Sequence, residues 1–374
     1  MRIVLISDSH TKENIDFIFD YLKKKAELKI DLIIINGDIL GENEAREGYG
    51  FGYNKTLFDA SIHKTEILKN LSPDFENLRK VAKAHTENRE EKYEIELSGF
   101  ILNYVKHRYD YLFELLTKFS EVAPVYFNIG TYESPLHYKA LNELAWLLDV
   151  PEAFIRSLAL LAPYRDTFKD FQAKVRDQNL KRLKYIGGNT VMINDLMIAG
   201  ISGYHENSVV TDKMSEFQEK MTQDLIDSVK RQLGPVNKLI LLNQTQGRLR
   251  KDPFSFRPTS MAIREFIEYL RGKLKQKIFV QSYHHFMTTH FYLATEFNFI
   301  LNNSAVNNSL FNMIEVGQKV NVYDVDPKND KIRLLNPYNS NLVDYKTADE
   351  RLALNYSASS DVISERNLKG CYYI

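Results

Sequence analysis

Two short runs of apolar residues near the start of the chain predict buried β-strands. They cover residues 3–6 and 32–35, are rich in β-branched side chains and show no alternation of apolar with polar positions. Such runs are typical of parallel strands that are buried on both faces. Between them, residues 14–28 place apolar side chains at the spacing of one helix face. The pattern therefore predicts a strand–helix–strand unit.

Further strands and helices follow, with two long interruptions. Strands are predicted at 125–129, 190–193, 196–201, 238–242, 277–280 and 297–301, and near 313–316, 320–325 and 331–335; helices are predicted at 95–119, within 136–182, and near 212–232 and 259–273. The predicted organisation is an α/β core (1–41, 123–133 and 185–344), a first helical insertion (42–122), a second helical insertion that forms a cap (134–184), and a polar C-terminal tail (345–374).

Composition and charge narrow the classes of protein. Hydrophobic residues make up 44% of the 374 residues, which is enough for a large core. Lysine plus arginine equals aspartate plus glutamate, at 49 each, so the formal net charge is zero and no surface-wide field for nucleic acid or membrane is expected. The single cysteine, Cys371, cannot form an internal disulfide. No stretch approaches the roughly 20 apolar residues of a membrane span. We therefore expect a cytoplasmic protein without a membrane association.

Polar residues with metal-ligand chemistry follow the predicted strands. Asp8 and His10 are two positions apart after the first strand, so an extended chain projects them to the same side. Asp38 follows the second strand, and His285 follows the strand at 277–280. Two carboxylates and two imidazoles suit manganese, iron or zinc. The alternative is that the aspartates cap helices or bind loop amides, and that the histidines only hydrogen-bond Asp38.

The order of motifs resembles that of the calcineurin-like metallophosphoesterases. Asp-x-His follows the first strand and Gly-Asp follows the second. Four later segments stand in the family's order: IAGISGY (198–204) is similar to its central glycine-containing strand, KLILLNQTQG (238–247) stands where it has a strand ending in Thr-His-x-Pro-Pro, FVQSYHH (279–285) stands where it has Gly-His-x-His, and FILNNSA (299–305) resembles the strand before its Asn-Pro-Gly-Ser turn. The resemblance implies an α/β sandwich of two mixed β-sheets flanked by helices, with the helical insertions added to it.

The resemblance also implies a metal site, of which this chain keeps one half. The family's enzymes hold two metal ions that act together on a phosphoester. The four residues named above, Asp8, His10, Asp38 and His285, match the ligands of the first ion. For the second ion the family has an asparagine and two histidines, and this chain has Thr131, Gln244 and Tyr283. Tyr132 stands where the family has the histidine that acts as general acid, so Gly130–Glu133 reads Gly-Thr-Tyr-Glu in place of Gly-Asn-His-Glu.

Two functions from different classes fit this half-site. In the first, the chain is a phosphomonoester or phosphodiester hydrolase that uses one retained metal ion. In the second, it is a catalytically inactive relative that binds a protein or nucleic-acid partner, and the joint loss of three ligands and the acid favours this reading for catalysis.

His205 could serve as a substitute ligand and His284 could replace Tyr283, but an ordinary loop histidine is the favoured interpretation of the first, and a one-residue shift in projection argues against the second. The basic stretch (Arg248, Arg250, Lys251, Arg257) could hold a phosphate or a nucleic-acid backbone, and a solvated loop explains it at least as well. The aromatic loop (Tyr49, Phe51, Tyr53) could stack on bases, but packing on its own protein is the more common role.

Overall fold

The first two strands of the core run parallel, as their unbroken apolar runs predict. In the computed structural model, β1 (Arg2–Ile6) and β2 (Leu32–Asn36) are parallel neighbours. Strand β2 is buried along its whole length, and β1 is buried except at its first residue. Helix α1 (Lys12–Lys24) and a short 3-10 turn, η1 (Ala26–Leu28), connect the two strands. The predicted strand–helix–strand unit is therefore confirmed.

The structure describes the main strands and helices and part of the segments between them. The described residues are 1–7, 9, 12–40, 77, 80–84, 91–130, 133, 145, 148–151, 154, 164–177, 182–202, 212–234, 238–243, 246–247, 259–273, 278–283, 291–294, 298–302, 311–317 and 320–334. The predicted polar tail at 345–374 and the aromatic loop at 48–54 lie outside them.

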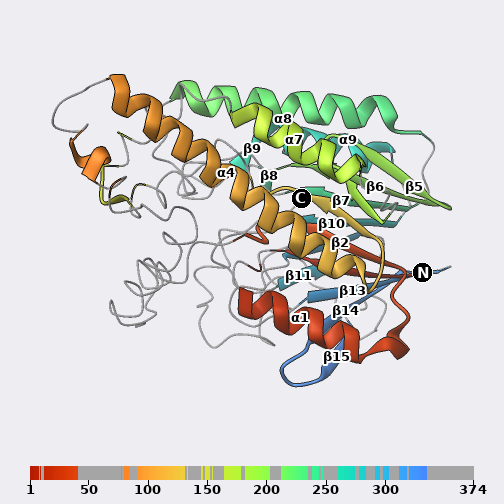
Figure 1. Ribbon diagram of the computed structural model, residues 1–374. Helices are drawn as coiled ribbons and strands as arrows, with labels where there is room; N and C mark the ends of the chain where they lie inside the picture. Colours follow the sequence, from red (N-terminus) through yellow and green to blue (C-terminus); the bar gives the residue numbers. More distant parts are fainter. Residues whose placement is uncertain are drawn as a thin grey trace, which may run out of the picture. The chain divides into compact units, whose positions relative to one another are not determined.

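A seven-stranded sheet is built around β1 and β2 (Figure 1). On the side of β2, the strands β3 (Val125–Asn128) and β4 (Leu183–Tyr185) extend it in parallel. On the side of β1, three antiparallel strands complete it, namely β13 (Phe311–Val316), β14 (Val320–Asp326) and β15 (Lys331–Leu334). The sheet is therefore mixed, with its parallel strands together on one side.

A six-stranded sheet has a parallel centre and antiparallel edges. Its order is β11-β12-β10-β7-β6-β5, in which β5 and β11 are the antiparallel edge strands. The bounds are β5 (Thr190–Ile193), β6 (Leu196–Ile201), β7 (Lys238–Asn243), β10 (Ile278–Tyr283), β11 (Phe291–Ala294) and β12 (Asn298–Asn302); β8 (Gln246–Gly247) and β9 (Thr259–Ser260) form a separate ribbon. The predicted fold class, two mixed β-sheets flanked by helices, is confirmed. The sequence pattern does not predict β4 or β11.

One apolar core joins the facing sides of the two sheets. Alternate residues of each strand enter it, because neighbouring side chains on a strand point to opposite faces. The seven-stranded sheet contributes Ile3, Leu5, Leu32 and Ile34, and the six-stranded sheet contributes Leu196, Ile198, Ile240 and Leu242. Burial of these side chains holds the two sheets together, at roughly 1.5–3 kcal/mol for each fully buried side chain.

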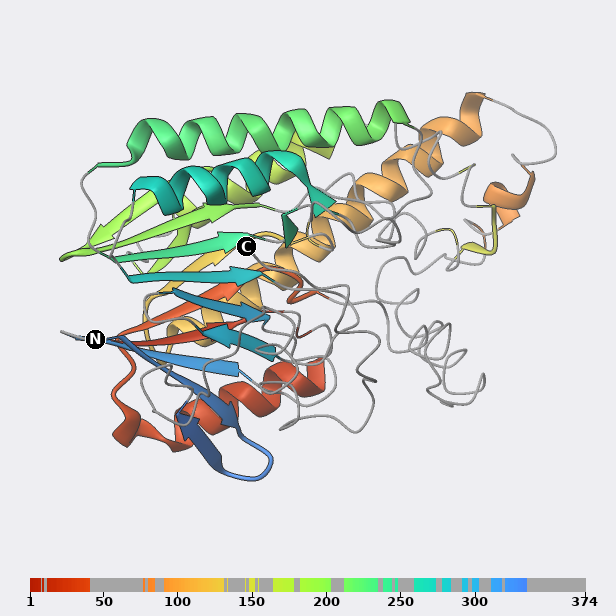
Figure 2. The same cartoon turned by 180° about the vertical axis from the view of Figure 1, so that it is seen from behind.

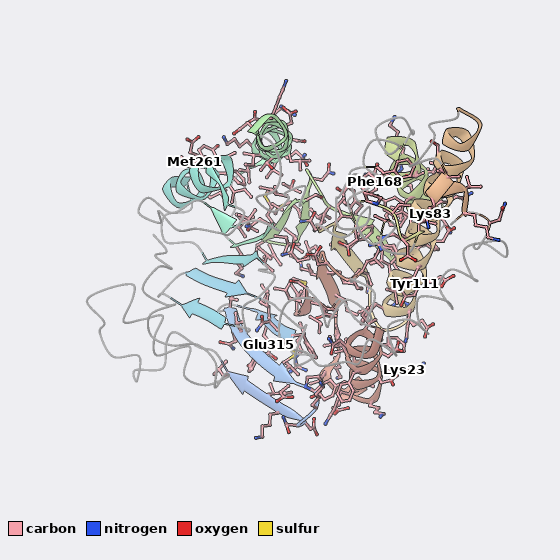
Figure 3. All side chains as sticks on the ribbon, turned by 90° about the vertical axis from the view of Figure 1, so that its left-hand side faces the viewer. Lys23, Lys83, Tyr111, Phe168, Met261 and Glu315 are labelled. Atoms are coloured by element: carbon pink, nitrogen blue, oxygen red, sulfur yellow. The ribbon has the colours of Figure 1, made fainter. Side chains whose placement is uncertain are left out.

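Two helices cover the outer face of the six-stranded sheet. These are α8 (Asp212–Gln232) and α9 (Met261–Lys273), which lie along the strands in Figure 2. Ile226 of α8 and Phe266 of α9 belong to the same buried cluster as the outward-facing residues of β6 and β7. Figure 3 looks along α8, labels Met261 at the start of α9, and shows the side chains between these helices and the strands. The two faces of this sheet therefore serve two separate apolar clusters.

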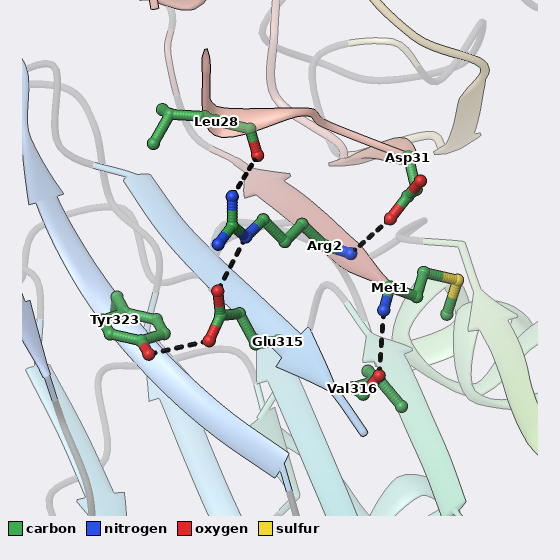
Figure 4. A network of polar contacts seen from close by, with 7 residues as sticks. All are labelled: Met1, Arg2, Leu28, Asp31, Glu315, Val316 and Tyr323. Carbon is green, nitrogen blue, oxygen red and sulfur yellow. Dashed lines mark hydrogen bonds and ion pairs between the residues drawn. The ribbon is translucent and has the colours of Figure 1, made fainter.

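A polar network ties the amino end of β1 to its neighbours (Figure 4). The Arg2 guanidinium donates to Glu315 of β13 at 2.7 Å and to the Leu28 carbonyl at 2.7 Å. The Tyr323 hydroxyl donates to the other carboxylate oxygen of Glu315 at 2.8 Å. Burial alone would raise the pKa of Glu315, but the hydrogen bonds from Tyr323 and Arg2 outweigh it and lower this pKa below its ordinary value. The network fixes the register of β1 at the end opposite Asp38.

The turn between β14 and β15 is tied to α1 by Asp330. Lys25 donates to it at 2.9 Å and the Tyr21 hydroxyl at 3.1 Å. These two hydrogen bonds hold the pKa of Asp330 below its ordinary value. Burial, followed by the hydrogen bond to Asp330, raises the pKa of Tyr21 to about 12.

Replacing Asp330 with asparagine is expected to lower the melting temperature at neutral pH and to have no effect in acid. Asp330 has a positive φ of 49°, which asparagine also tolerates, so the backbone should be kept. The folded-state pKa is lowered, so the ionised carboxylate stabilises the protein above the unfolded value of about 3.9. This contribution disappears as the pH falls through the lower folded value. Melting curves of both proteins from pH 7 to pH 3 should therefore converge, and a constant difference would contradict the assignment.

The chain forms two compact units. The first contains Met1–Ile39, Phe119–Thr131 and Arg182–Ile374, and the second contains Leu40–Lys118 and Tyr132–Lys181. Both sheets belong to the first unit. The predicted bounds of the insertions, and the prediction that the second one forms a cap, stay predictions.

In the second unit, which contains α4 (Glu91–Ser120) up to Lys118, this helix packs against α7 (Tyr164–Asp177). The ring of Tyr109 lies 5.1 Å from that of Phe171 between centroids, and its hydroxyl donates to the backbone carbonyl of Glu133 at 2.9 Å. The buried Glu133 carboxylate in turn accepts a hydrogen bond from the Leu40 amide at 2.8 Å. Glu133, the one residue after Gly130 that matches the family's Gly-Asn-His-Glu, therefore has a structural role in this chain.

None of the described helices combines the length and the apolar character that crossing a membrane requires.

Candidate functional site

Five buried polar residues of the first unit lie at the carboxyl ends of its parallel strands. Ser7 follows β1, Asn36 ends β2, Asn128 ends β3, Ser202 follows β6 and Asn243 ends β7, and all five are buried. In the register of the strands, Asn36 lies opposite Asn128. Open α/β sheets bind their ligands at this edge. The candidate site is therefore built on these strand ends.

Asp38 leaves β2 in an unusual backbone conformation. Gly37 has a φ of 75° and Asp38 a φ of 49°, so two successive residues are left-handed. Such a conformation costs about 1–2 kcal/mol for a residue with a side chain, although aspartate is among the residues that adopt it most readily. Asp38 is also only 1% exposed. A buried carboxylate on a strained turn is a feature of functional sites more than of ordinary turns.

Four side chains behind this edge form a continuous chain of hydrogen bonds, which we call the buried polar seam. Its members are Tyr185, Ser202, Asn128 and Asn36. The Tyr185 and Ser202 oxygens lie 2.6 Å apart, and the Ser202 hydroxyl donates to the Asn128 amide oxygen at 2.6 Å. The Asn128 amide nitrogen donates to the Asn36 oxygen at 3.3 Å and to the Ile201 carbonyl at 2.8 Å. The seam thus links strands of both sheets.

The hydrogen bonds of the seam run in one direction. An asparagine oxygen can only accept, so the single proton of Ser202 goes to Asn128. The hydroxyl of Tyr185 must then be the donor to Ser202. At the other end, the Asn36 amide nitrogen donates to the backbone carbonyl of Asn243 at 3.4 Å. The two backbone carbonyls fix the amide orientations, because a carbonyl only accepts and the nitrogens of Asn128 and Asn36 must therefore face Ile201 and Asn243. The oxygen of Asn128 accepts from Ser202, and its amide nitrogen donates to Asn36 and to Ile201.

Gly187 makes room for the seam. A Cβ atom at this position would overlap the Ser202 hydroxyl and the Tyr185 hydroxyl. Gly187 also pairs with Gly200 of β6 in an isolated parallel bridge. The close approach of the chain after β4 to β6 therefore needs a residue without a side chain.

Of the predicted first-site ligands, Asp38 lies among the described residues. Asp8, His10 and His285 lie outside them, and so do Thr131, Tyr132 and Gln244. Tyr283 is described as the last residue of β10, where its backbone pairs with Asn302, but its side chain is not. The described part of the chain, to which Asp8, His10 and His285 do not belong, holds no group of three or more His, Cys, Asp or Glu side chains that could bind a metal. The predicted metal site therefore stays a prediction.

The two residues that flank Asp8, Ser7 and Ser9, are among the described residues. Ser7 and Ser9 are each 1% exposed, and the Asn14 side chain of α1 donates to the Ser9 carbonyl at 3.1 Å. The chain after β1 is thus buried and held by α1. Because β1 and β2 are parallel neighbours, this segment and Asp38 leave the sheet at the same edge.

The sequence pattern does not point to the seam. Neutral amides and hydroxyls match no metal or catalytic motif, so only their placement shows that they act together. One signal was present: LIIIN and VYFN each end an apolar strand with an asparagine. An asparagine is a poor strand residue, and its presence at the end of two predicted neighbours could have indicated a polar pair.

A recess of about 500 Å³ lies at the opposite end of the strands. It is lined by residues at the amino ends of β2 and β3, among them Leu32 and Pro124, and by Asn194 of the turn between β5 and β6. Asp38 and the seam lie at the carboxyl ends of β2 and β3. The recess is therefore separate from the candidate site.

The chain is similar in structure to several solved proteins. GAP50, described as the anchor in the inner membrane complex of Plasmodium, matches with 10% identity and a TM-score of 0.41, over 90% of this chain and 88% of that one. TT1561 of Thermus thermophilus matches with 9% identity and a TM-score of 0.34, over 90% and 98%. A 5'-nucleotidase from Candida albicans matches with 12% identity and a TM-score of 0.35, over 88% and 52%. No protein-family model and no curated protein sequence matches the chain. The fold assignment rests on the strand order and pairing described above.

Proposed function

We propose that this protein is a metal-dependent phosphoester hydrolase that works with one divalent ion. The ion would be manganese, iron or zinc, and its ligands would be Asp8, His10, Asp38 and His285. The substrate would be a phosphomonoester or a phosphodiester. The cytoplasmic location expected from the single cysteine belongs to the same proposal.

The observation that carries the proposal is the placement of Asp38. Its carboxylate is buried on a left-handed turn at the carboxyl edge of β2. The neighbouring parallel strand leads directly into Asp8-Ser9-His10 at the same edge. Carboxylate oxygens are ordinary ligands of divalent ions, so a divalent ion fits this position. Two carboxylates and two imidazoles are also a chemically suitable donor set.

A bound ion would act as a Lewis acid on the phosphoester and assist the attack of water. The chain's own residues would hold and orient the ion. Asp38 is suited to this because it is buried and follows directly after the end of β2. Tyr132 stands at the position of the general acid, but the ordinary pKa of a tyrosine, near 10, makes it a weak acid catalyst at neutral pH. We therefore expect slow turnover.

One ion is proposed because the chain lacks ligands for a second. Thr131, Gln244 and Tyr283 replace the three residues that the resemblance implies. Asn128, three positions before Thr131, is engaged in the seam, where its amide oxygen accepts from Ser202 and its amide nitrogen donates twice.

A second candidate function is a non-catalytic binding protein. The observation in its favour is the same joint replacement of three ligands and the acid, which removes the machinery for turnover while leaving the fold intact. In this case the site would bind a protein or nucleic-acid partner. Both candidates predict a folded protein, and they differ in whether metal-dependent hydrolysis occurs.

The proposal is tested by replacing Asp38 with asparagine in the full chain. Asparagine has the same shape and tolerates a positive φ, so the fold should be kept. We expect the wild-type protein to bind roughly one Mn²⁺ ion per chain and to hydrolyse a generic aryl phosphodiester slowly with Mn²⁺. The variant should lose Mn²⁺ affinity by about 100-fold or more, since changes around a ligand alone cost 10–100-fold. Metal content and titration calorimetry measure binding, and product absorbance measures turnover.

The matched control is Asp20→Asn, the same change at an exposed position of α1. It should leave both metal binding and turnover unchanged. Mn²⁺ binding without hydrolysis in the wild-type protein would favour the binding protein over the hydrolase. A wild-type protein that neither binds metal nor hydrolyses the diester would overturn the proposed function.

A further inference from the structure

The buried polar seam lies directly before the chain segments that the proposed site uses. Asn36 precedes Asp38 by two residues, and Asn128 precedes Thr131 by three. Asn243, whose carbonyl ends the seam, is followed by Gln244. Ser202 opens the segment that contains His205. The strand ends that the seam joins thus lead into the segments that carry the proposed site positions.

The seam also fixes a distance that the sheets alone do not. Hydrogen bonds within a sheet set the spacing of β2 to β3 and of β6 to β7. The facing sides of the two sheets are joined by apolar packing, which is non-directional. The bonds from Ser202 to Asn128 and from Asn36 to the Asn243 carbonyl cross this gap at its open end. They give a defined geometry to strand ends that apolar contact would leave adjustable.

We propose that the buried polar seam is a positioning network, whose one-way chain of hydrogen bonds from Tyr185 through Ser202 and Asn128 to Asn36 holds the turn of Asp38 in place relative to the ends of β6 and β7. Its members are positioning residues, because they act on the site through the backbone. For its effect on metal binding the inference rests on the proposed function, whereas its effect on the turn itself does not.

Because the hydrogen bonds are donated in one direction, substitutions at different positions of the seam should have effects of different size. Ser202→Ala removes the side-chain donor to the Asn128 oxygen and breaks the chain in the middle. Tyr185→Phe removes a donor at its start and leaves the bond from Ser202 to Asn128 in place. We therefore expect Ser202→Ala to have the larger effect and Tyr185→Phe a smaller one in the same direction. The milder variant also keeps the test available if the first fails to fold.

The first measurement is hydrogen exchange of the full chain by mass spectrometry, with residues 36–40 as the reporter. Ser202 reaches Asn36 through the side chain of Asn128. A local packing role of Ser202 would speed exchange only near 125–130 and 185–202. The positioning role predicts that Ser202→Ala also speeds exchange at 36–40 by about tenfold, which corresponds to 1.4 kcal/mol. Unchanged exchange at 36–40 in both variants would overturn the inference.

The matched control is Tyr21→Phe, which deletes a hydroxyl that donates to Asp330, away from the strand ends. It should leave exchange at 36–40 as in the wild-type protein. Faster exchange at 36–40 in this variant as well would show a general loss of stability and would also overturn the inference.

The second measurement is the affinity for Mn²⁺ alone, by titration calorimetry well below the melting temperature. If the wild-type protein binds Mn²⁺, the inference predicts about tenfold weaker binding by Ser202→Ala and no change in Tyr21→Phe. Equal affinities of Ser202→Ala and the wild-type protein would overturn it. If the wild-type protein binds no Mn²⁺, the proposed function fails, and the exchange at 36–40 alone decides the inference.

Discussion

Replacing Phe119 with alanine is expected to lower the free energy of unfolding by about 3–5 kcal/mol. Phe119 lies in the last turn of α4 and is 0% exposed. Its ring meets that of Phe19 on α1 edge to face, with centroids 5.9 Å apart and an interplanar angle of 85°. The truncation therefore removes a large buried side chain and a favourable aromatic pair, and it leaves a cavity under α1.

The expected loss of stability in Phe119→Ala depends on the burial of its side chain. A second phenylalanine, which is exposed, tests this dependence. Phe17 is on the same helix as Phe19 but is 39% exposed. Phe17→Ala should cost less than about 1 kcal/mol, because it leaves no closed cavity and alanine is the better helix former. Urea unfolding of the three proteins, followed by circular dichroism, measures both values. Equal midpoints for the two variants would contradict the burial seen at Phe119.

The sequence predicts best those strands and helices whose formation is determined by the local pattern of apolar residues. Strand β6 and helix α8 have the predicted bounds, 196–201 and 212–232. Strand β6 is buried on both faces, with one face in each of the two apolar clusters, so it must be apolar throughout. A long surface helix must repeat its apolar positions at helical spacing, so both elements leave a clear pattern. Strand β4 has only three residues, with an exposed lysine in the middle, and it exists because its backbone pairs with β3. That cause lies in a distant segment and is not written into the local pattern.

In the candidate site, too, the feature set by local sequence was predicted, and the feature formed by contacts between distant residues was not. Asp38 was predicted from its place after an apolar strand, and the structure puts it at that strand end in a left-handed turn. The other predicted ligands, Asp8, His10 and His285, remain predictions. The buried polar seam was missed because its neutral amides and hydroxyls match no metal or catalytic motif. Its role becomes visible only where the Ser202 hydroxyl bonds to Asn128 across the two sheets. These two residues are 74 positions apart along the chain.

Replacing Gly200 with alanine is expected to destabilise the protein by about 3 kcal/mol. A Cβ atom there would lie 2.6 Å from the carbonyl oxygen of Ile186 and 3.0 Å from its carbonyl carbon. These are backbone atoms, so no flexible side chain can move aside. Gly200 also accepts a hydrogen bond from the Gly188 amide at 2.8 Å, so shifting this segment would break a bond that holds it to β6.

The same substitution at Gly99 should have the opposite sign. Gly99 is an exposed residue of α4, and apart from its chain neighbours and its own helix backbone no described atom lies within 4 Å of its added Cβ. Gly99→Ala should therefore stabilise the protein by about 0.5–1 kcal/mol, through the helix preference of alanine. Chemical denaturation of the two variants measures both effects, and a neutral Gly200→Ala would show that the chain after β4 does not need its close approach to β6.

The close approach of the chain after β4 to β6 also brings Tyr185 to Ser202. Gly200→Ala should therefore speed hydrogen exchange at residues 36–40 as well, because the seam loses its first donor when Ile186 is pushed away.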